Sequence, residues 1–306
     1  MRTPQMVRLS KALAAAWLFV LAAAPGELAA QSTGEQAADA SADAAPGPAN
    51  NIGEKPAQRR DRVTIGAGVA LVPSYEGSND YVVLPAPAVR GSLSGYNFFS
   101  RGAALYVDVL RDHGSLNVEF GPVVAINFNR TNRIVDPRVR ALGKRKGAFE
   151  AGGFVGLSKT GVITSAYDTL GVRVAVRQDV SGIHRSYVVS PSIDYGTPLS
   201  EKIYVGVSAA ASFAGRGYAE SYFAVDAAGA ARSGLPIFAN PRGGFKDFTL
   251  SALGSYALSG DLRQGWALFA TGSWGRLQGD FAASPVTRIA GNPTQFLGAI
   301  GVGYTF

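Results

Sequence analysis

The chain has no cysteine, and only two of its 306 residues are histidines, His113 and His184. Without cysteine, neither a disulfide framework nor a thiolate metal site is available. The two histidines are the only imidazole bases that catalysis could use. No catalytic, cofactor or metal motif accompanies them, so we expect a protein without enzymatic activity, cofactor or metal.

A concentrated basic surface is also missing. The formal net charge of +7 is spread along the chain and forms no basic stripe. No helix-turn-helix, zinc finger or base-stacking motif accompanies this charge. The sequence therefore predicts no nucleic-acid partner.

Long apolar runs are rare, and the clearest one is "ALAAAWLFVLAAA" at residues 12–24. Its 13 residues fall short of the ~20 that a membrane-spanning helix needs. The basic residues Arg2, Arg8 and Lys11 precede it, which is typical of a secretory signal peptide. We predict a signal peptide over residues 1–30, cleaved near Ala30.

Residues 31–61 contain Ala, Gly, Pro, Ser and charged residues but almost no large apolar side chain. Such a segment buries too little surface to offset the entropy lost on ordering. We expect a disordered periplasmic lead before a folded domain at residues 62–306.

The folded domain repeats one pattern, a strict alternation of large apolar residues with small or polar ones. In "SLNVEFGPVVAINF", residues 115–128, the apolar parity includes Leu116, Val118 and Phe120. The last eleven residues, "FLGAIGVGYTF", alternate in the same way. A period of two indicates strands with two different faces.

A soluble sandwich and a transmembrane barrel would both produce this alternation. Strands of around ten residues are long enough to cross a bilayer when tilted. Aromatic residues recur near strand ends, and the connections divide into short and long ones, as in outer-membrane barrels. We predict an all-β fold, a transmembrane antiparallel up-and-down β-barrel in the cell outer membrane of a Gram-negative bacterium.

The connections also allow the strands to be counted. If the last strand descends into the periplasm, the long connections at residues 130–146, 215–244 and 276–293 all fall outside the cell. The first four strands are then expected at residues 63–72, 81–90, 92–99 and 102–110. The total is twelve, with ten as the alternative because residues 92–99 form the weakest strand.

Several charged residues fall on the parity that faces the lumen. An Arg near the bilayer midplane on the lipid side would cost ~2–4 kcal/mol. These charges either form an ion-pair network that braces the barrel or line an aqueous path. The candidate lumen charges are Asp108, Glu119, Glu150, Arg173, Arg177 and Asp194.

Three other features admit both a chemical and a structural interpretation. His184 and Ser186 share a strand face, as a base and a nucleophile would, but we expect His184 to be a solvated hairpin residue. Glu76 and Asp80 offer too few ligands for a calcium loop, so we expect an acidic surface turn. The long segment at residues 215–244 is apolar for a loop, which predicts either a lid over the barrel mouth or a patch for a partner.

Several segments in order resemble one family. They are "VPSYEGSNDYVVLPAP" (72–87), "NFFSRG" (97–102), "VRQDVSG" (176–182), "ARSGLP" (231–236), "GGFKD" (243–247) and "NPTQFLGAIGVGYTF" (292–306). The chain thus resembles the family of MltA-interacting protein (MipA) and OmpV over the whole barrel. The resemblance implies a scaffold that brings a lytic transglycosylase together with a peptidoglycan synthase, and no catalytic residue. A small solute pore and a surface adhesin are the alternatives.

The expected partners follow from this location. They are outer-membrane lipid and lipopolysaccharide, the barrel insertion machinery, and a periplasmic murein hydrolase and synthase. The terminal aromatics Tyr304 and Phe306 resemble the C-terminal signal that the insertion machinery reads.

Overall fold

The computed structural model describes residues 61–111 and 114–306. The predicted signal peptide, all but the last residue of the predicted lead, and His113 lie outside the described residues. None of the helices in the described ranges has the length and apolar character needed to cross a bilayer.

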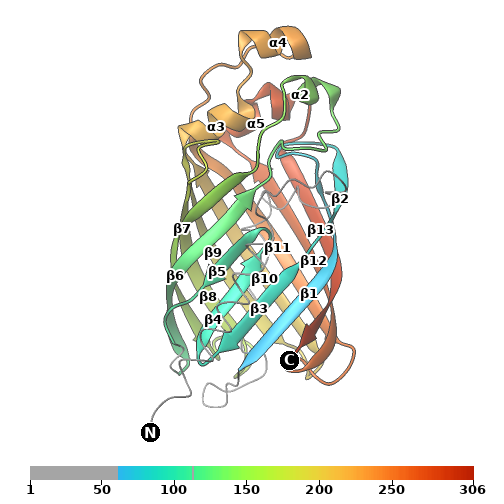
Figure 1. Cartoon of the computed structure of the whole chain (residues 1–306). Helices are drawn as coiled ribbons and strands as arrows, with labels where there is room; N and C mark the ends of the chain where they lie inside the picture. The colour runs from blue at the N-terminus through green and yellow to red at the C-terminus, as the bar shows by residue number, and fades with distance from the viewer. Residues whose placement is uncertain (1–60, 112–113) are drawn as a thin grey trace, which may run out of the picture. The chain divides into compact units, whose positions relative to one another are not determined.

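One antiparallel sheet contains all the strands of the described residues, and neighbours in the chain are neighbours in the sheet except around β1 (Figure 1). The strands are β1 (Arg62–Pro73), β2 (Tyr81–Pro85), β3 (Ala88–Leu93), β4 (Tyr96–Arg101), β5 (Ala104–Val107), β6 (Leu116–Asn127), β7 (Ala148–Thr160), β8 (Thr169–Asp179), β9 (Tyr187–Pro198), β10 (Ile203–Ala214), β11 (Gly244–Ala257), β12 (Gly265–Leu277) and β13 (Thr294–Thr305).

The sheet closes on itself because the first strand pairs with the last. Their antiparallel register runs from Thr64 opposite Thr305 to Leu71 opposite Gly298. β2 and β3 both pair with β1 in one continuous register, so together they make a single crossing. The barrel therefore has twelve crossings, which confirms the predicted count.

The predicted boundary between the second and third crossings is wrong. The chain turns at Ser94 and Gly95, whose φ angles of 54° and 84° suit a tight two-residue hairpin. Gly91, where we expected the turn, lies inside β3. A Cβ atom at Gly91 would stand 2.5 Å from the ring of Phe98, so this glycine makes room for a neighbouring aromatic side chain.

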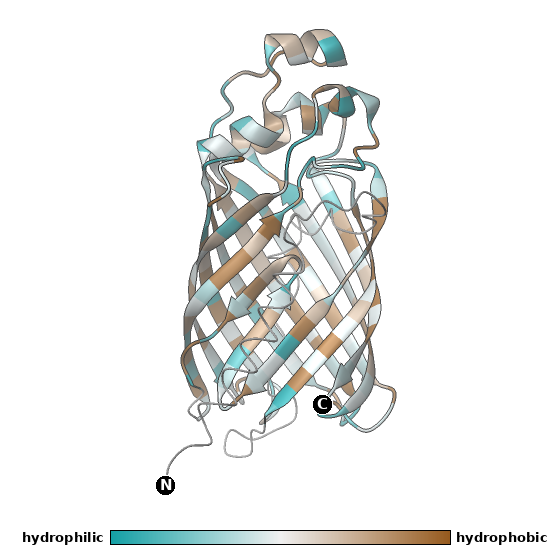
Figure 2. Cartoon of the chain, viewed as in Figure 1, coloured by the Kyte–Doolittle hydropathy of each residue, from teal (hydrophilic) through white to brown (hydrophobic). Residues whose placement is uncertain are grey.

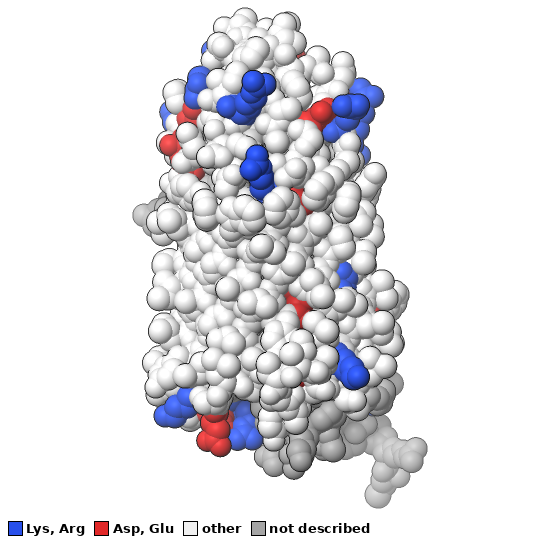
Figure 3. All heavy atoms as spheres, turned by 180° about the vertical axis from the view of Figure 1, so that it is seen from behind, with Lys and Arg blue, Asp and Glu red and all other residues white. Residues whose placement is uncertain are grey.

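The outer surface of the barrel is apolar, as the alternation predicts. Val118, Val155 and Ile300 each expose about half of their surface, at 51%, 53% and 51%. Figure 2 shows apolar residues recurring along the strands. Figure 3 shows charged side chains gathered mainly at the two ends, with few on the wall between them. This is the surface expected of a wall that faces lipid.

The small residues of the last strand face the lumen and leave room for an inward aromatic side chain. A Cβ atom at Gly301 would lie 2.5 Å from the ring of Phe269, and one at Gly66 would lie 3.2 Å from it. The glycines of β1 and β13 therefore accommodate the Phe269 ring of β12 inside the barrel.

The two ends of the barrel differ. One end, here called the capped end, carries the helices α2 (Pro137–Ala141), α3 (Arg216–Phe223), α4 (Ala227–Ser233), α5 (Gly279–Ala283) and α6 (Pro285–Arg288) (Figure 1). The other, the turn end, holds the connections at residues 94–95, 108–115, 161–168, 199–202 and 258–264 and the C-terminus. The long connections thus share one end, as predicted.

The C-terminal aromatics lie at the turn end. The ring centroids of Tyr304 and Phe306 are 4.8 Å apart, and those of Trp266 and Tyr304 are 5.1 Å apart. The Phe306 N–H donates to the carbonyl of Val63 at 2.9 Å, while its side chain is 69% exposed. Phe306 therefore contributes one backbone bond to barrel closure, and its ring stays largely exposed beside that of Tyr304.

Removing Phe306 is expected to impair membrane insertion more than export, because export uses the other end of the chain. The measurement is the ratio of heat-modifiable, folded protein in the outer membrane to unfolded protein in the periplasm. Phe296→Ala, which removes a ring that is 55% exposed at the opposite end of β13, is the control and should insert normally. Normal assembly without Phe306 would refute the role of this residue as a signal.

Candidate functional site in the barrel lumen

Four charged side chains from β4, β6, β8 and β9 form a continuous chain inside the barrel, here called the charge chain. Its members are Arg101, Glu119, Arg173 and Asp194. Arg173 donates to Glu119 at 2.7 Å, and its Nη1 lies 3.5 Å from Asp194 Oδ2. Arg101 binds both oxygens of Asp194, at 3.0 and 3.2 Å. Two cations and two anions balance, so the charge chain is neutral.

Aromatic rings enclose the middle of the charge chain. The Arg173 guanidinium lies 4.7 Å from the ring centroid of Phe99, 5.8 Å from that of Tyr106 and 5.6 Å from that of Phe154. Phe99 and Tyr106 stack at 5.0 Å, and all three rings are buried. Cation–π contact at a desolvated guanidinium is favourable. Side chains therefore fill the lumen along β4 to β9 at this level.

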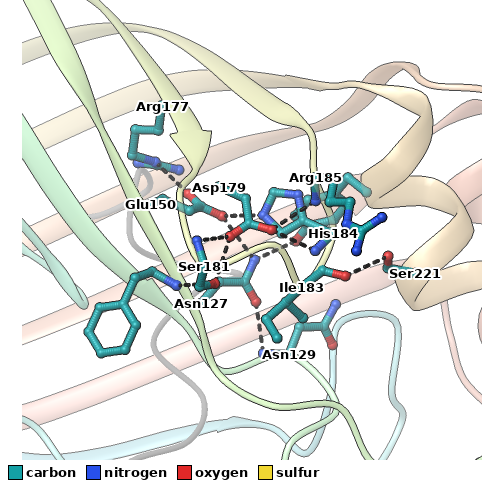
Figure 4. Close-up of polar contacts among 12 residues, drawn as sticks. Asn127, Asn129, Glu150, Arg177, Asp179, Ser181, Ile183, His184, Arg185 and Ser221 are labelled. Atoms are coloured by element: carbon teal, nitrogen blue, oxygen red, sulfur yellow. Dashed lines mark hydrogen bonds and ion pairs between the residues drawn. The ribbon is translucent and has the colours of Figure 1, made fainter. Parts of the chain in front are cut away.

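A second buried cluster lies nearer the capped end and centres on Glu150 (Figure 4). Glu150 accepts from Arg177 Nε at 3.0 Å and from Asn127 Nδ2 at 3.3 Å, and it lies 3.1 Å from His184 Nε2. The exposed fractions of Glu150, Arg177 and His184 are 2%, 3% and 2%. Alternation alone brings Glu150 and Arg177 inward, from β7 and β8.

His184 is buried, so the expectation of a solvated hairpin residue is wrong. Its ring packs edge-on against Tyr218 with centroids 5.1 Å apart. The ring nitrogen Nε2 contacts Glu150, and within the described residues Nδ1 has no hydrogen-bond partner. No hydrogen bond joins the side chains of His184 and Ser186 in the described residues, so a base–nucleophile pair is not assembled.

Five of the six sequence-predicted lumen charges fall into these two clusters. Asp108 is the exception. Its Oδ1 accepts the backbone N–H groups of Leu110 and Phe120, at 3.0 and 3.1 Å, where β5 leads into the turn at residues 108–115. Asp108 thus satisfies backbone donors close to the turn end instead of joining an ion pair with the other five.

Sequence reasoning missed a third cluster, formed by Glu76, Lys246 and Asp247. Lys246 forms ion pairs with Glu76 and, at 3.2 Å, with Asp247. Lys246 and Asp247 are consecutive but both face inward, because a bulge shifts the register of β11 against β10 between Ser212 and Phe213. Glu76 is only 4% exposed, so the expectation of an acidic surface residue is wrong for it.

The helix α3 closes over these clusters at the capped end. Tyr218, Tyr222 and Phe223 on α3 are at most 1% exposed. The Tyr218 hydroxyl donates to Glu76 at 2.8 Å, and its ring lies 5.1 Å from the Lys246 ammonium. Residues 215–244 thus place α3 as a lid on the lumen.

A second apolar layer joins the lid to the other long loops. It contains Tyr75, Ile134, Val139, Leu142, Val225, Leu235, Val286 and Ala290. Arg130 ties this layer to α3, because its Nη1 donates to the carbonyl of Tyr222 at 2.7 Å. Burial lowers the pKa of Arg130 to about 10. Four separate loops therefore pack into one cap.

A small, partly open hollow with room for about one water molecule lies at the capped end beside the third cluster. Its polar lining comes from Glu76, Asp247, Thr249, Ser273, Arg276 and Gln295, on β11, β12, β13 and the loop after β1. Neither here nor elsewhere in the described residues do three His, Asp or Glu side chains gather as metal ligands.

At the turn end, residues 161–168 form a loop that is hydrogen-bonded around one carboxylate. Asp168 accepts from the N–H groups of Val162 and Ile163, at 2.6 and 2.8 Å, and from the Tyr195 hydroxyl at 3.0 Å. Burial alone would raise the pKa of Asp168, but these bonds and that from the Thr164 N–H outweigh it and hold the pKa below its usual range. The loop leaves Ile163 65% exposed.

The closed, lipid-faced sheet with a polar interior defines an outer-membrane β-barrel. Residues 65–306 match the family described as MltA-interacting protein MipA, and the chain belongs to this family. No curated protein matches the chain by sequence.

Several solved structures show a distant structural similarity to this chain. An outer membrane channel from Pseudomonas putida F1 has a TM-score of 0.41 and 11% identity, covering 85% of this chain and 99% of its own. The CymD monoaromatic hydrocarbon channel has a TM-score of 0.38 and 12% identity, and the match covers 89% of this chain and 98% of the channel. The NanC porin has a TM-score of 0.38 and 12% identity, and the match covers 80% of this chain and 99% of the porin. These distant similarities identify no shared solute.

Replacing Arg173 by Met is expected to destabilise the barrel by ~3–5 kcal/mol, because it leaves Glu119, whose side chain is only 16% exposed, without its cation. The double variant Arg173→Met with Glu119→Leu should recover most of this loss. The measurement is the free energy of unfolding in urea, with the protein in lipid vesicles.

The control is Arg216→Met, which breaks the exposed Arg216–Glu220 pair on α3. An exposed pair contributes only ~0–1 kcal/mol. Equal losses for Arg173→Met and Arg216→Met would contradict a structural role for the charge chain.

Proposed function

We propose that this protein is an occluded outer-membrane barrel that serves as a scaffold for peptidoglycan-remodelling enzymes. Its turn end faces the periplasm of a Gram-negative bacterium, and its capped end faces outward. Family membership supports a periplasmic murein hydrolase of the MltA type, a lytic transglycosylase, as one partner, and a peptidoglycan synthase as the second.

The filled lumen supports scaffolding over free diffusion of solutes. The charge chain and its aromatic rings occupy the interior along β4 to β9, and Phe269 packs over the glycines on the opposite side. Above them, the lid helix α3 buries Tyr218 and Tyr222. The proposal assigns no reaction to the protein, since His184 contacts Glu150 and not Ser186.

The observation that carries the proposal is the loop at residues 161–168. It presents three apolar side chains, Val162, Ile163 and Tyr167, which are 37%, 65% and 36% exposed. Asp168 fixes the backbone beneath them through several N–H groups. A preorganised apolar protrusion loses little entropy on binding, which makes it a suitable anchor for a periplasmic enzyme.

The remaining partners follow from the same orientation. Lipopolysaccharide and outer-membrane lipid surround the wall whose apolar residues face outward. The barrel insertion machinery would read the final strand, with Tyr304 and Phe306 at the turn end.

Ile163→Asp is expected to weaken binding of a purified MltA-type lytic transglycosylase to the full-length barrel by about tenfold or more, as loss of a buried anchor does. Val180→Asp is the matched control. Val180 is 66% exposed and lies just beyond the opposite end of the same strand, β8, so the substitution introduces the same charge at the capped end.

Binding is measured in detergent micelles by surface plasmon resonance, with folding checked by heat-modifiable migration on gels. If wild-type protein binds and Ile163→Asp binds equally well, the loop is not the docking site. If the wild type binds neither a lytic transglycosylase nor a synthase, the scaffold role itself is wrong.

A further inference from the structure

One stretch of the barrel wall has an unpaired edge. β2 pairs with β1 from Val69 opposite Pro85 to Pro73 opposite Tyr81. Among the described strands, none pairs with the other edge of β2, because the β4–β5 hairpin turns back at Gly102, opposite β3. The wall therefore has a notch, bounded by β2, the tip of this hairpin and the loop that follows β6.

The direction of the backbone groups along this edge can be read from one bond. The Ala86 N–H donates to the carbonyl of Gly68 on β1 at 2.9 Å. Along β2, the N–H groups of even-numbered residues therefore point toward β1, and those of odd-numbered residues point into the notch. Residues 85 and 87 are both proline, which has no N–H. The two prolines occupy positions where a donor would otherwise face the notch.

Two further contacts satisfy this edge. The Ser100 hydroxyl accepts from the Val89 N–H at 3.0 Å and donates to its carbonyl at 3.2 Å. Arg133 donates from Nη1 to the carbonyl of Val83, also at 3.2 Å. Side chains from β4 and from the loop after β6 thus make hydrogen bonds that a neighbouring strand would otherwise make.

An unpaired backbone group is costly in hydrocarbon, which is why open sheet edges are absent from lipid. Here two prolines, a serine and an arginine reduce that cost at a single edge. The same prolines make the edge a poor template for an added strand, since strand addition needs backbone donors. The edge is therefore suited to staying open to lipid and unsuited to pairing with another chain.

The notch is apolar and lined by small residues. On its outer side Val83 is 60% exposed, and Pro85 and Pro87 are exposed as well. On the inner side, Leu84 and the alanines at positions 86 and 88 face the lumen. A Cβ atom at the lumen-facing Gly66 would lie 3.6 Å from the Cβ atom of Ala88, which places Ala88 on this side. Glu76 lies between the two spaces, because it contacts Asn129 after β6 and also lines the hollow.

We propose that the notch is a lateral passage between the outer leaflet and the space beneath the cap, and that it admits small molecules with an apolar body. The cap covers the axial route at this end, whereas the unpaired edge of β2 faces hydrocarbon. The carboxylates, hydroxyls and amide of the hollow would then meet the polar part of an entering molecule. This role is independent of docking at the turn end.

The test uses the absence of cysteine from the chain. Ala86→Cys places a thiol on the lumen side of the notch. Ala299→Cys is the matched control, because Ala299 also faces the lumen but is paired on both sides, with Ala70 and Thr271. Each full-length variant is reconstituted in phosphatidylcholine vesicles and treated with N-phenylmaleimide or with a sulfonated, membrane-impermeant maleimide.

N-phenylmaleimide should label Ala86→Cys at least about tenfold faster than Ala299→Cys, because an uncharged aromatic reagent concentrates in hydrocarbon. The sulfonated reagent should label neither variant at a comparable rate. Equal rates at the two positions with N-phenylmaleimide would overturn the proposal, and so would fast labelling of Ala86→Cys by the sulfonated reagent. If Ala86→Cys does not fold, Leu84→Cys replaces it with the same expectations.

Discussion

Every backbone N–H and C=O group inside hydrocarbon needs a partner within the protein, and the rest of this structure depends on that requirement. Pairing of β1 with β13 satisfies it for the barrel as a whole, since a closed sheet has no free edge along that seam. The notch beside β2 is the local exception. There, the chain removes donors with Pro85 and Pro87 and supplies side-chain partners from Ser100 and Arg133.

Closure divides the side chains of each strand between lipid and lumen, and this division brings the charges together. Polar residues on the inward parity of neighbouring strands have no bulk water to solvate them once the lumen is filled, so they pair with one another. Arg173 with Glu119, and Arg177 with Glu150, are pairs of this kind. The lid also pairs with a lumen charge, because the Tyr218 hydroxyl donates a hydrogen bond to Glu76.

Alternation in the sequence was sufficient to predict the barrel and its twelve crossings, because a period of two sets the face of each residue. Alternation was insufficient where a tight turn or a bulge changes which face a residue occupies. Arg101 was missed because the third strand was expected to end at residue 99, which put Arg101 in a turn, whereas β4 extends to Arg101. Lys246 was missed because a bulge breaks the alternation in β11. The burial of His184 and Glu76 depends on α3, whose packing no local pattern specifies.

The central claim is that paired charges, aromatic rings and a helical lid occlude the barrel. Single-channel recording of the full-length protein in planar lipid bilayers tests this claim most directly. The account predicts no steady open level for the wild-type protein. A stable, reproducible open conductance from wild-type barrels would contradict it, because an aqueous path would then run through the lumen that these side chains are said to fill.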